Sequence, residues 1–358
     1  MSAPVHGGNA PQLPVRLGVI GSGRHVDELA AQQPWGYPFV GRHAVITACA
    51  PPAHAACRLD ALAQPSGARR FDSGRELIAA GGVDAVLLLV PAAQRAELAR
   101  AAIEAGHSVL CPAPLALGMQ QMNALAQAVA NGRSGAVIVA AGALAHTPAG
   151  RHALDVIAGG TAGRIESAYA GVRWHAHDAH ARSVHAALPE TAWDVLDFML
   201  EALDAPVARV YAHAARLFES GDAHDTVVAI MRFANEAVFS FEAAACLPPA
   251  LPAPHAGEIE LELIGADETL RIEPYRTAVG IARTPSPIDA AHPGALARVE
   301  YRDWVEPPIA GMIGALLAAM REPRRALDAL ARQHRLAALA DAMRASIESA
   351  QAVEAAAA

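Results

Sequence analysis

The most informative absence in this sequence is lysine. All 28 residues of the lysine-plus-arginine class are arginine, so no position can supply a lysine amine for chemistry. Positive charge is also dispersed: the arginines are scattered, acidic residues outnumber them, and the formal net charge is -8. Nucleic-acid binding needs clustered cations that neutralise phosphates. We therefore expect no nucleic-acid partner.

Cysteine is scarce, and no hydrophobic run is long enough to cross a membrane. The four cysteines form no CxxC pair, and two of them, Cys49 and Cys111, lie in apolar strand-like runs. Buried free thiols in a reducing compartment are the expected state. The apolar stretch 309–320 is too short to span a bilayer, and residues 1–14 lack the pattern of a signal peptide. We expect a cytoplasmic protein with a flexible tail over residues 1–14 and no membrane partner.

The first half of the chain alternates apolar strands with helical segments. The expected strands cover residues 15–20, 44–49, 84–90, 108–111 and 136–141. Helices are expected between them, among others at 93–105 and 119–130. Continuous apolar strands separated by helices indicate a parallel sheet with both faces covered, and right-handed crossovers make it doubly wound. The sequence thus predicts an α/β, Rossmann-type dinucleotide-binding domain over residues 15–142.

After residue 142 the pattern changes to strands that follow one another without long helices between them. The expected strands cover residues 164–174, 207–217, 226–233, 237–244, 259–264 and 269–272. Helices are expected at 152–157, 192–203, 308–320 and 324–350. This order is typical of an α+β domain with helices on one face of a largely antiparallel open sheet. We expect residues 143–358 to form that domain, for substrate binding and oligomerisation.

A glycine pair marks the first strand-to-helix turn. Gly21 would permit the tight turn, and Gly23 would let the backbone approach a pyrophosphate at the following helix N-terminus. Val26 replaces the third glycine of the usual fingerprint, and a turn that serves only strand–helix packing is the alternative. The candidate cofactor-binding residues are Gly21, Gly23, Arg24, His25 and Pro91, which ends the strand at 84–90.

The second strand lacks the feature that sets cofactor choice in such domains. That strand usually ends in Asp or Glu, which binds the ribose hydroxyls, whereas an arginine nearby accommodates a 2′-phosphate. Here Cys49 is followed by Ala50, Pro51 and Pro52, with no carboxylate and no arginine beside them in the sequence. The expected cofactor is therefore NAD or NADP, with no preference between the two.

Several segments together resemble the glucose–fructose oxidoreductase / inositol dehydrogenase (Gfo/Idh/MocA) family. They are Gly21-x-Gly23, Val90-Pro91, residues 107–117 (HSVLCPAPLAL), residues 163–165 (GRI) and residues 194–197 (DVLD). The resemblance covers nearly the whole chain, and 107–117 is its most specific part. It implies a Rossmann domain, a second domain with an open sheet, a nicotinamide cofactor and a small-molecule ligand.

The resemblance also shows where this chain departs from the family in its first domain. Active members read Glu-Lys-Pro after the strand at 108–111, and their lysine reaches the substrate hydroxyl and the nicotinamide. The matching residues here are Pro112, Ala113 and Pro114, so alanine stands at the lysine position. A methyl group neither carries charge nor transfers a proton.

A second departure lies on the helix of the second domain. The family's Asp-x-x-x-His and a further Asp fall on Glu190, Asp194 and Asp197, so Asp194 stands at the position of the histidine base. The histidine that often follows the Pro of the third strong strand falls near Arg95. Since alcohol oxidation needs a base that takes the hydroxyl proton as hydride leaves, the resemblance argues against ordinary dehydrogenation.

Two sets of residues could replace the missing groups. A histidine cluster at 175–185 lies where the family runs over its substrate pocket, and His177 is the candidate catalytic residue. A metal site and a polar loop that binds nothing are the alternatives, and no metal is assigned. Glu190 and Asp194 are four residues apart on one helical face, where one carboxyl could retain a proton. Glu190 could instead serve only to stabilise the helix start.

Three functions follow from these alternatives. The first is a protein with a degenerate active site that binds a nucleotide or sugar-like ligand and acts as a sensor, a regulatory subunit or a partner of an active paralogue. The second is an NAD(P)H-dependent reductase of an imine or another activated double bond, with His177, Glu190 or Asp194 as proton donor. The third is a structural assembly protein. A homo-oligomer is expected in each case.

Overall fold

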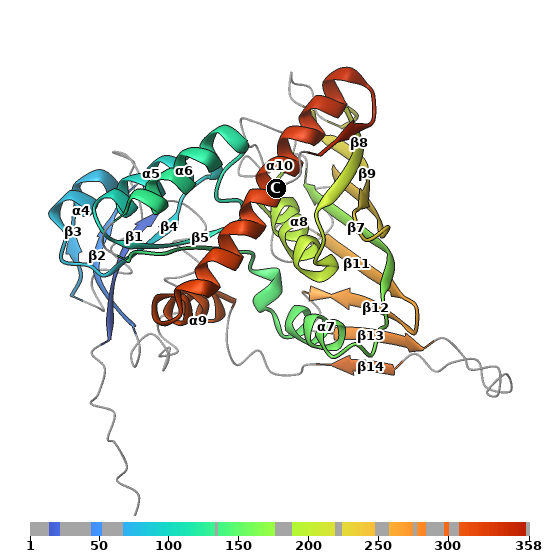
Figure 1. Ribbon diagram of the computed structural model, residues 1–358, viewed down its shortest axis with the longest axis horizontal. Helices are drawn as coiled ribbons and strands as arrows, with labels where there is room; N and C mark the ends of the chain where they lie inside the picture. Colours follow the sequence, from blue (N-terminus) through green and yellow to red (C-terminus); the bar gives the residue numbers. More distant parts are fainter. Residues whose placement is uncertain are drawn as a thin grey trace, which may run out of the picture.

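The structure is a computed structural model that describes residues 14–21, 44–51, 67–132, 135–175, 188–218, 224–247, 258–274, 278–283, 297–300 and 308–355. The strands in these ranges form two sheets. We call the sheet formed by β1 to β6 the first sheet, and that formed by β7 to β15 the second sheet. The two lie side by side, with the long helix α10 between them (Figure 1).

The first sheet is entirely parallel, as the sequence predicts. Its strands are β1 (Val15–Gly21), β2 (Ala44–Ala50), β3 (Arg69–Arg70), β4 (Ala85–Leu89), β5 (Ser108–Pro112) and β6 (Ile138–Ala141). They are arranged in the order β3-β2-β1-β4-β5-β6. The order turns back on itself at β1 and β4, which confirms the doubly wound, Rossmann-like sheet. Sheets of this type bind their ligands at the carboxyl ends of the strands beside that point.

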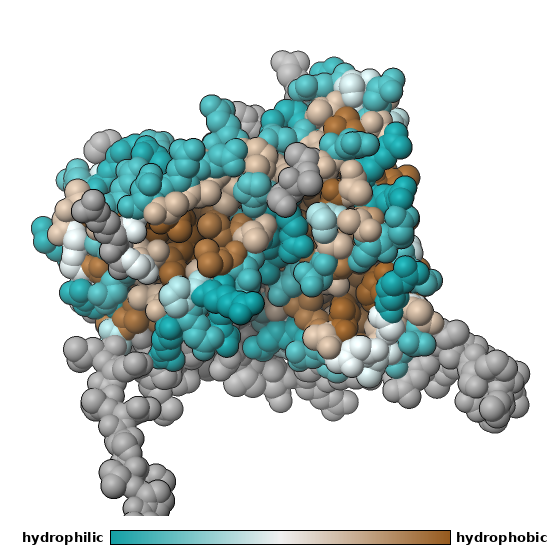
Figure 2. Space-filling model, in the orientation of Figure 1, coloured by the Kyte–Doolittle hydropathy of each residue, from teal (hydrophilic) through white to brown (hydrophobic). Residues whose placement is uncertain are grey.

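Alternate residues of these strands pack against different helices, since successive side chains of a strand point to opposite faces. Ile20 of β1 lies in a core shared with α4 (Gly74–Ala80), α5 (Ala92–Glu104) and α6 (Met119–Asn131). Leu17 and Val19 lie in a second core with α9 (Pro308–Arg321). On the face seen in Figure 2, hydrophobic residues gather over the first sheet between α6 and α9.

Helix α9 shows that the chain returns to the first sheet near its end. The sequence interpretation placed everything after residue 142 in the second domain, yet Met312, Ile313 and Leu316 of α9 share a core with the first sheet, and α9 contacts β5 and β6. The apolar pattern of α9 predicts a buried helix but contains no information about which sheet it covers.

The second sheet is largely antiparallel, which confirms the α+β expectation. Its strands are β7 (Ile165–His175), β8 (Val207–Ala215), β9 (Thr226–Phe233), β10 (Val238–Leu247), β11 (Glu258–Gly265), β12 (Glu268–Glu273), β13 (Ala278–Arg283), β14 (Ala297–Glu300) and β15 (Val353–Glu354). They are arranged in the order β14-β13-β12-β11-β7-β10-β9-β8-β15, and β7–β10 is the parallel pair among them. Helices α7 (Pro148–Ala158), α8 (Glu190–Leu203) and α10 (Pro323–Ser349) share its core.

Helix α10 connects the two halves of the molecule through side chains that complete other elements. Asp341 accepts a hydrogen bond from the backbone N–H of Met119 (2.8 Å), which caps the N-terminus of α6 from a distant part of the chain. Ser346 accepts from the N–H of Ala212 on β8 (2.9 Å). No helix within the described ranges, α10 included, is both long enough and apolar enough to cross a membrane.

Candidate functional site

The carboxyl ends of β1 and β4 bring two of the predicted cofactor-binding residues to one edge. Gly21 is the last residue of β1 and pairs in register with Leu89 of β4. Pro91 follows β4 and is the exposed N-cap residue of α5. Because parallel sheets of this type bind ligands at this edge, both residues stay candidates for cofactor contact. The other three, Gly23, Arg24 and His25, lie outside the described residues.

Arg95 is the centre of the polar contacts at this edge. It projects from α5, and its side chain is completely buried. Its Nε donates to the carbonyl oxygen of Val90 (2.9 Å). Its Nη1 lies within hydrogen-bond distance of the carbonyls of Pro112, Ala113 and Pro114, at 3.3, 3.0 and 3.2 Å. The guanidinium therefore holds the segment after β5 against α5.

The remaining partner of Arg95 is Glu190, the first residue of α8. Arg95 Nη2 and Glu190 Oε1 form an ion pair at 2.5 Å, which joins the first half of the chain to the second. The Glu190 side chain is 26% exposed. Since Pro189 caps α8 without a side-chain hydrogen bond, the carboxylate also interacts favourably with the positive end of the helix dipole. Glu190 therefore lies at the helix start, where the sequence analysis considered a stabilising role, and it also pairs there with Arg95.

Ala113, at the family's lysine position, has no access to a substrate hydroxyl in this structure. It is 2% exposed and packs in the core with Ala92, Leu117 and Leu144. Its polar backbone oxygen is directed at the Arg95 guanidinium. The position thus combines an apolar side chain with a carbonyl that is already hydrogen-bonded.

Asp194, at the family's histidine position, lies in a different environment. Both of its carboxylate oxygens accept from the N–H of Leu144, at 3.2 and 3.1 Å, at the start of a 3₁₀ turn over Leu144–His146. Removal from water raises the pKa of Asp194 to about 7, and the negative charges of Asp197 and Glu190 act in the same direction. Asp194 can therefore hold or release a proton near neutral pH.

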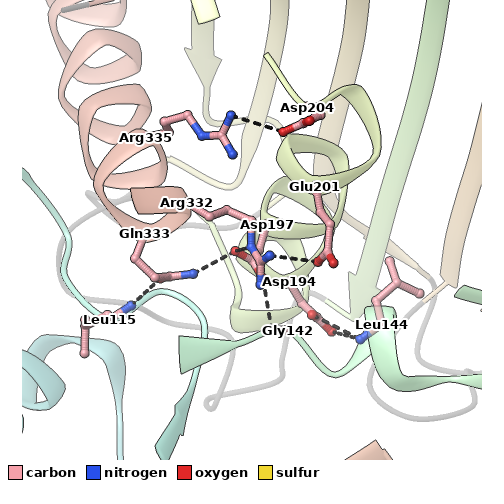
Figure 3. Close-up of polar contacts among 10 residues, drawn as sticks. All are labelled: Leu115, Gly142, Leu144, Asp194, Asp197, Glu201, Asp204, Arg332, Gln333 and Arg335. Carbon is pink, nitrogen blue, oxygen red and sulfur yellow. Dashed lines mark hydrogen bonds and ion pairs between the residues drawn. The ribbon is translucent and has the colours of Figure 1, made fainter. Parts of the chain in front are cut away.

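Asp197 is the most enclosed acid of α8, and its contacts are shown in Figure 3. Its carboxylate accepts from the N–H of Gly142 (3.0 Å), from Arg332 Nε (3.1 Å) and from Gln333 Nε2 (2.7 Å). Gln333 Oε1 in turn accepts from the N–H of Leu115 (2.9 Å). This network fixes α8, α10, and the segments after β5 and β6 to one another.

Gly142 is required where Asp194 and Asp197 approach the backbone. A Cβ atom there would lie 2.2 Å from Asp194 Oδ1 and 3.1 Å from Asp197 Oδ2. Asp194, which sequence reasoning assigned to chemistry, and Asp197, which it did not, therefore both contact the loop that follows β6. Sequence reasoning missed Arg332 and Gln333, because an arginine and a glutamine in a long helix with several other arginines give no sign of a buried partner.

The histidine cluster falls mostly outside the described residues, including the candidate His177. His175, at the end of β7, is described: its Nδ1 lies 3.3 Å from the carbonyl oxygen of Leu247. Among the side chains that the structure describes, no group of His, Cys, Asp and Glu is arranged to hold a metal ion.

The fold combines a parallel, Rossmann-like sheet with a second, largely antiparallel sheet. The model of the oxidoreductase family with an NAD-binding Rossmann fold (GFO_IDH_MocA) matches residues 15–140, and the GFO/IDH/MocA C-terminal domain matches residues 150–271. The chain therefore belongs to the GFO/IDH/MocA family of oxidoreductases, as the sequence resemblance implies. No curated protein matches it at a significant level.

Solved structures of low sequence identity share the fold along nearly the whole chain. An NAD-binding oxidoreductase from Klebsiella pneumoniae has a TM-score of 0.77 at 19% identity, covering 97% of this chain and 100% of that one. A levoglucosan dehydrogenase in complex with NADH and L-sorbose has a TM-score of 0.77 at 20% identity, covering 96% and 99%. An Agrobacterium radiobacter oxidoreductase in complex with NAD+, L-tartaric acid and magnesium has a TM-score of 0.72 at 16% identity, covering 96% and 98%.

Proposed function

We propose that this protein binds a nicotinamide dinucleotide and a small polar ligand, such as a sugar, without the lysine-dependent dehydrogenation that the family resemblance implies. The environment of Ala113 carries the proposal. Its methyl group is buried in the core, and its carbonyl is bound by Arg95, so the place of the lysine amine is closed. The family fold and the NADH complexes of structural relatives support cofactor binding.

The acids near Ala113 do not replace the lysine and the histidine that the family uses to accept a proton. Oxidising an alcohol requires a group that accepts the hydroxyl proton while hydride leaves. Glu190 is the counterion of a buried guanidinium, and Asp194 accepts from the Leu144 N–H. Taking up a proton would cost Glu190 its charge interaction with Arg95. We infer that these carboxylates position the loops rather than process an alcohol.

The proposed roles are those of a sensor, a regulatory subunit or a partner of an active paralogue. A homo-oligomer through the outer face of the second sheet fits such roles. Tyr211, Val228, Ile230 and Val238 are exposed on adjacent strands of that face, where apolar side chains favour burial against another surface. The buried free thiols of Cys49 and Cys111 are consistent with a reducing compartment, and we propose the cytoplasm.

One observation favours a second candidate, an NAD(P)H-dependent reductase of an imine or another activated double bond. With a pKa of about 7, Asp194 is partly protonated near neutral pH and could act as an acid. In that reaction the cofactor would give hydride to the carbon of the C=N bond. Asp194 would give its proton to the nitrogen and become a carboxylate, to be reprotonated from water.

Cofactor titration and a turnover assay test the proposal. Purified protein is titrated with NADH and NADPH by fluorescence, and then incubated with NAD+ or NADP+ and a panel of sugars and polyols. We expect saturable binding and no formation of reduced cofactor. Steady oxidation of an alcohol would overturn the proposal.

An imine-reduction assay with the same purified protein distinguishes the reductase from the first candidate. Reduction of cyclic imines with NADPH that is lost in Asp194→Asn, with cofactor binding unchanged, would favour the reductase. Binding of neither cofactor at millimolar concentration would overturn both cofactor-dependent candidates and direct the search to protein partners and other ligands.

A further inference from the structure

The carboxyl end of β2 is where a Rossmann domain contacts the ribose that distinguishes NAD from NADP. Here β2 ends at Ala50, which is followed by Pro51, and both residues are buried. Neither side chain accepts a hydrogen bond from a ribose hydroxyl. Neither carries the negative charge that repels a 2′-phosphate in an NAD-selective site.

Strand β3 places two arginines directly beside this end of β2. In the parallel pairing, Arg69 is in register with Ala48 and Arg70 with Cys49. The N–H of Phe71 then donates to the carbonyl of Cys49 at 3.0 Å. The two strands therefore end together, although the arginines follow β2 only after a long intervening segment. Sequence reasoning searched for an arginine next to β2 in the chain and missed these two.

Both arginines reach the surface, and Arg69 is ordered by an aromatic ring. The residues are exposed, and the guanidinium carbon of Arg69 lies 4.6 Å from the ring centroid of Phe71. Stacking uses the flat face of the guanidinium, whereas its N–H donors lie at the edge and match a phosphate in a bidentate way.

Successive strand residues point to opposite faces, and Ala48 and Cys49, the partners of Arg69 and Arg70, lie in cores on opposite faces of the sheet. We propose that Arg69 binds the 2′-phosphate of NADP(H), and that the protein prefers NADP(H) over NAD(H). The inference rests on the proposed dinucleotide binding and deepens it. A 2′-phosphate carries between one and two negative charges near neutral pH, and the exposed guanidinium of Arg69 beside the end of β2 complements that charge. An unphosphorylated ribose gains nothing comparable from it.

The test is a set of equilibrium titrations with NADPH and NADH, using wild-type protein, Arg69→Gln, Arg70→Gln and the double variant. The wild-type Kd for NADPH should lie roughly tenfold or more below that for NADH, the size of one charge-assisted contact. Arg69→Gln and the double variant should raise the NADPH Kd by about the same factor and leave the NADH Kd within about twofold, whereas Arg70→Gln alone should change neither Kd by more than about twofold. The advantage of NADPH should shrink as salt is added.

Arg100→Gln is the matched control, because Arg100 is an exposed arginine of the same domain that pairs with Glu104 on α5. It should leave both dissociation constants unchanged. Melting temperatures show whether the double variant is folded, and a competition of 2′,5′-ADP against 5′-AMP isolates the phosphate contribution.

The outcomes separate this inference from the proposed function. NADH binding as tight as NADPH binding would overturn the inference and leave dinucleotide binding intact. Equal weakening of both cofactors in the double variant would also overturn it, because the arginines would then act on shared parts of the ligand. Binding of neither cofactor would defeat the proposed function itself.

Discussion

Replacing Glu190 by Gln tests the central contact of the site. Gln has nearly the shape of Glu, so the start of α8 keeps its packing while the negative charge is lost. Arg95, whose side chain is 0% exposed, would then be left with carbonyl partners alone. A buried cation without a counterion is unfavourable, and the variant should be less stable than the wild-type chain.

The magnitude follows from the burial of the two partners. Breaking a fully buried ion pair costs about 3–5 kcal/mol, because the remaining charge stays buried. Glu190 is 26% exposed, so water screens part of the interaction. We therefore expect a loss of about 2 kcal/mol in the free energy of unfolding, measured from urea denaturation midpoints.

Glu97→Gln is the matched control. Glu97 lies on α5, as Arg95 does, and pairs with Arg75, but both side chains of that pair are 63% exposed. An exposed pair contributes at most about 1 kcal/mol. If Glu190→Gln costs no more than Glu97→Gln, the Arg95–Glu190 contact does not hold the two halves of the site together, and the reasoning is refuted.

Three further changes test the surroundings of that contact. Gly142→Ala should destabilise the fold by about 2–3 kcal/mol in chemical denaturation, because its Cβ would meet the carboxylates of Asp194 and Asp197; a neutral effect would mean that this loop yields easily. Burial raises the folded-state pKa of Asp194 to about 7, above the ordinary value of 3.8, so its contribution to stability is present below pH 4 and is lost as pH rises to about 7. Because Asn does not titrate, the stability of Asp194→Asn relative to wild type should rise between pH 5 and pH 8; an unchanged difference between the two urea midpoints at both pH values would contradict this. Ala113→Lys would bury an amine beside the Arg95 guanidinium and should lower the free energy of unfolding by about 3 kcal/mol, measured from urea denaturation midpoints; a stable variant that oxidises sugars would contradict the closed site.

The sequence predicts most of the fold because its strongest signals are apolar runs. The strand expected at 226–233 matches β9, and the helix expected at 119–130 matches α6 to within one residue. The short β3 was missed, because Arg69 and Arg70 form no apolar run and the strand exists only through its pairing with β2. Strands β13, β14 and β15 were missed as well.

The site is harder to predict, because its contacts join residues far apart in the chain. The resemblance places Arg95, Glu190 and Asp194 at functional positions, but not the ion pair between the first two. A fully buried arginine is also rare, so its burial runs against the usual preference of the side chain. Only the fold shows that five N–H donors can be satisfied by carbonyls after β4 and β5 together with a carboxylate from α8.

Isothermal titration of NADPH and NADH into the purified, full-length chain tests the account most directly. Occupancy of the site stabilises the native state by about 2.7 kcal/mol at a ligand concentration 100 times Kd, so a melting scan at saturation provides a second reading. The account predicts saturable binding, tighter for NADPH, with no alcohol oxidised afterwards. Heat of dilution alone up to millimolar concentrations of both cofactors, with an unchanged melting temperature, would contradict it.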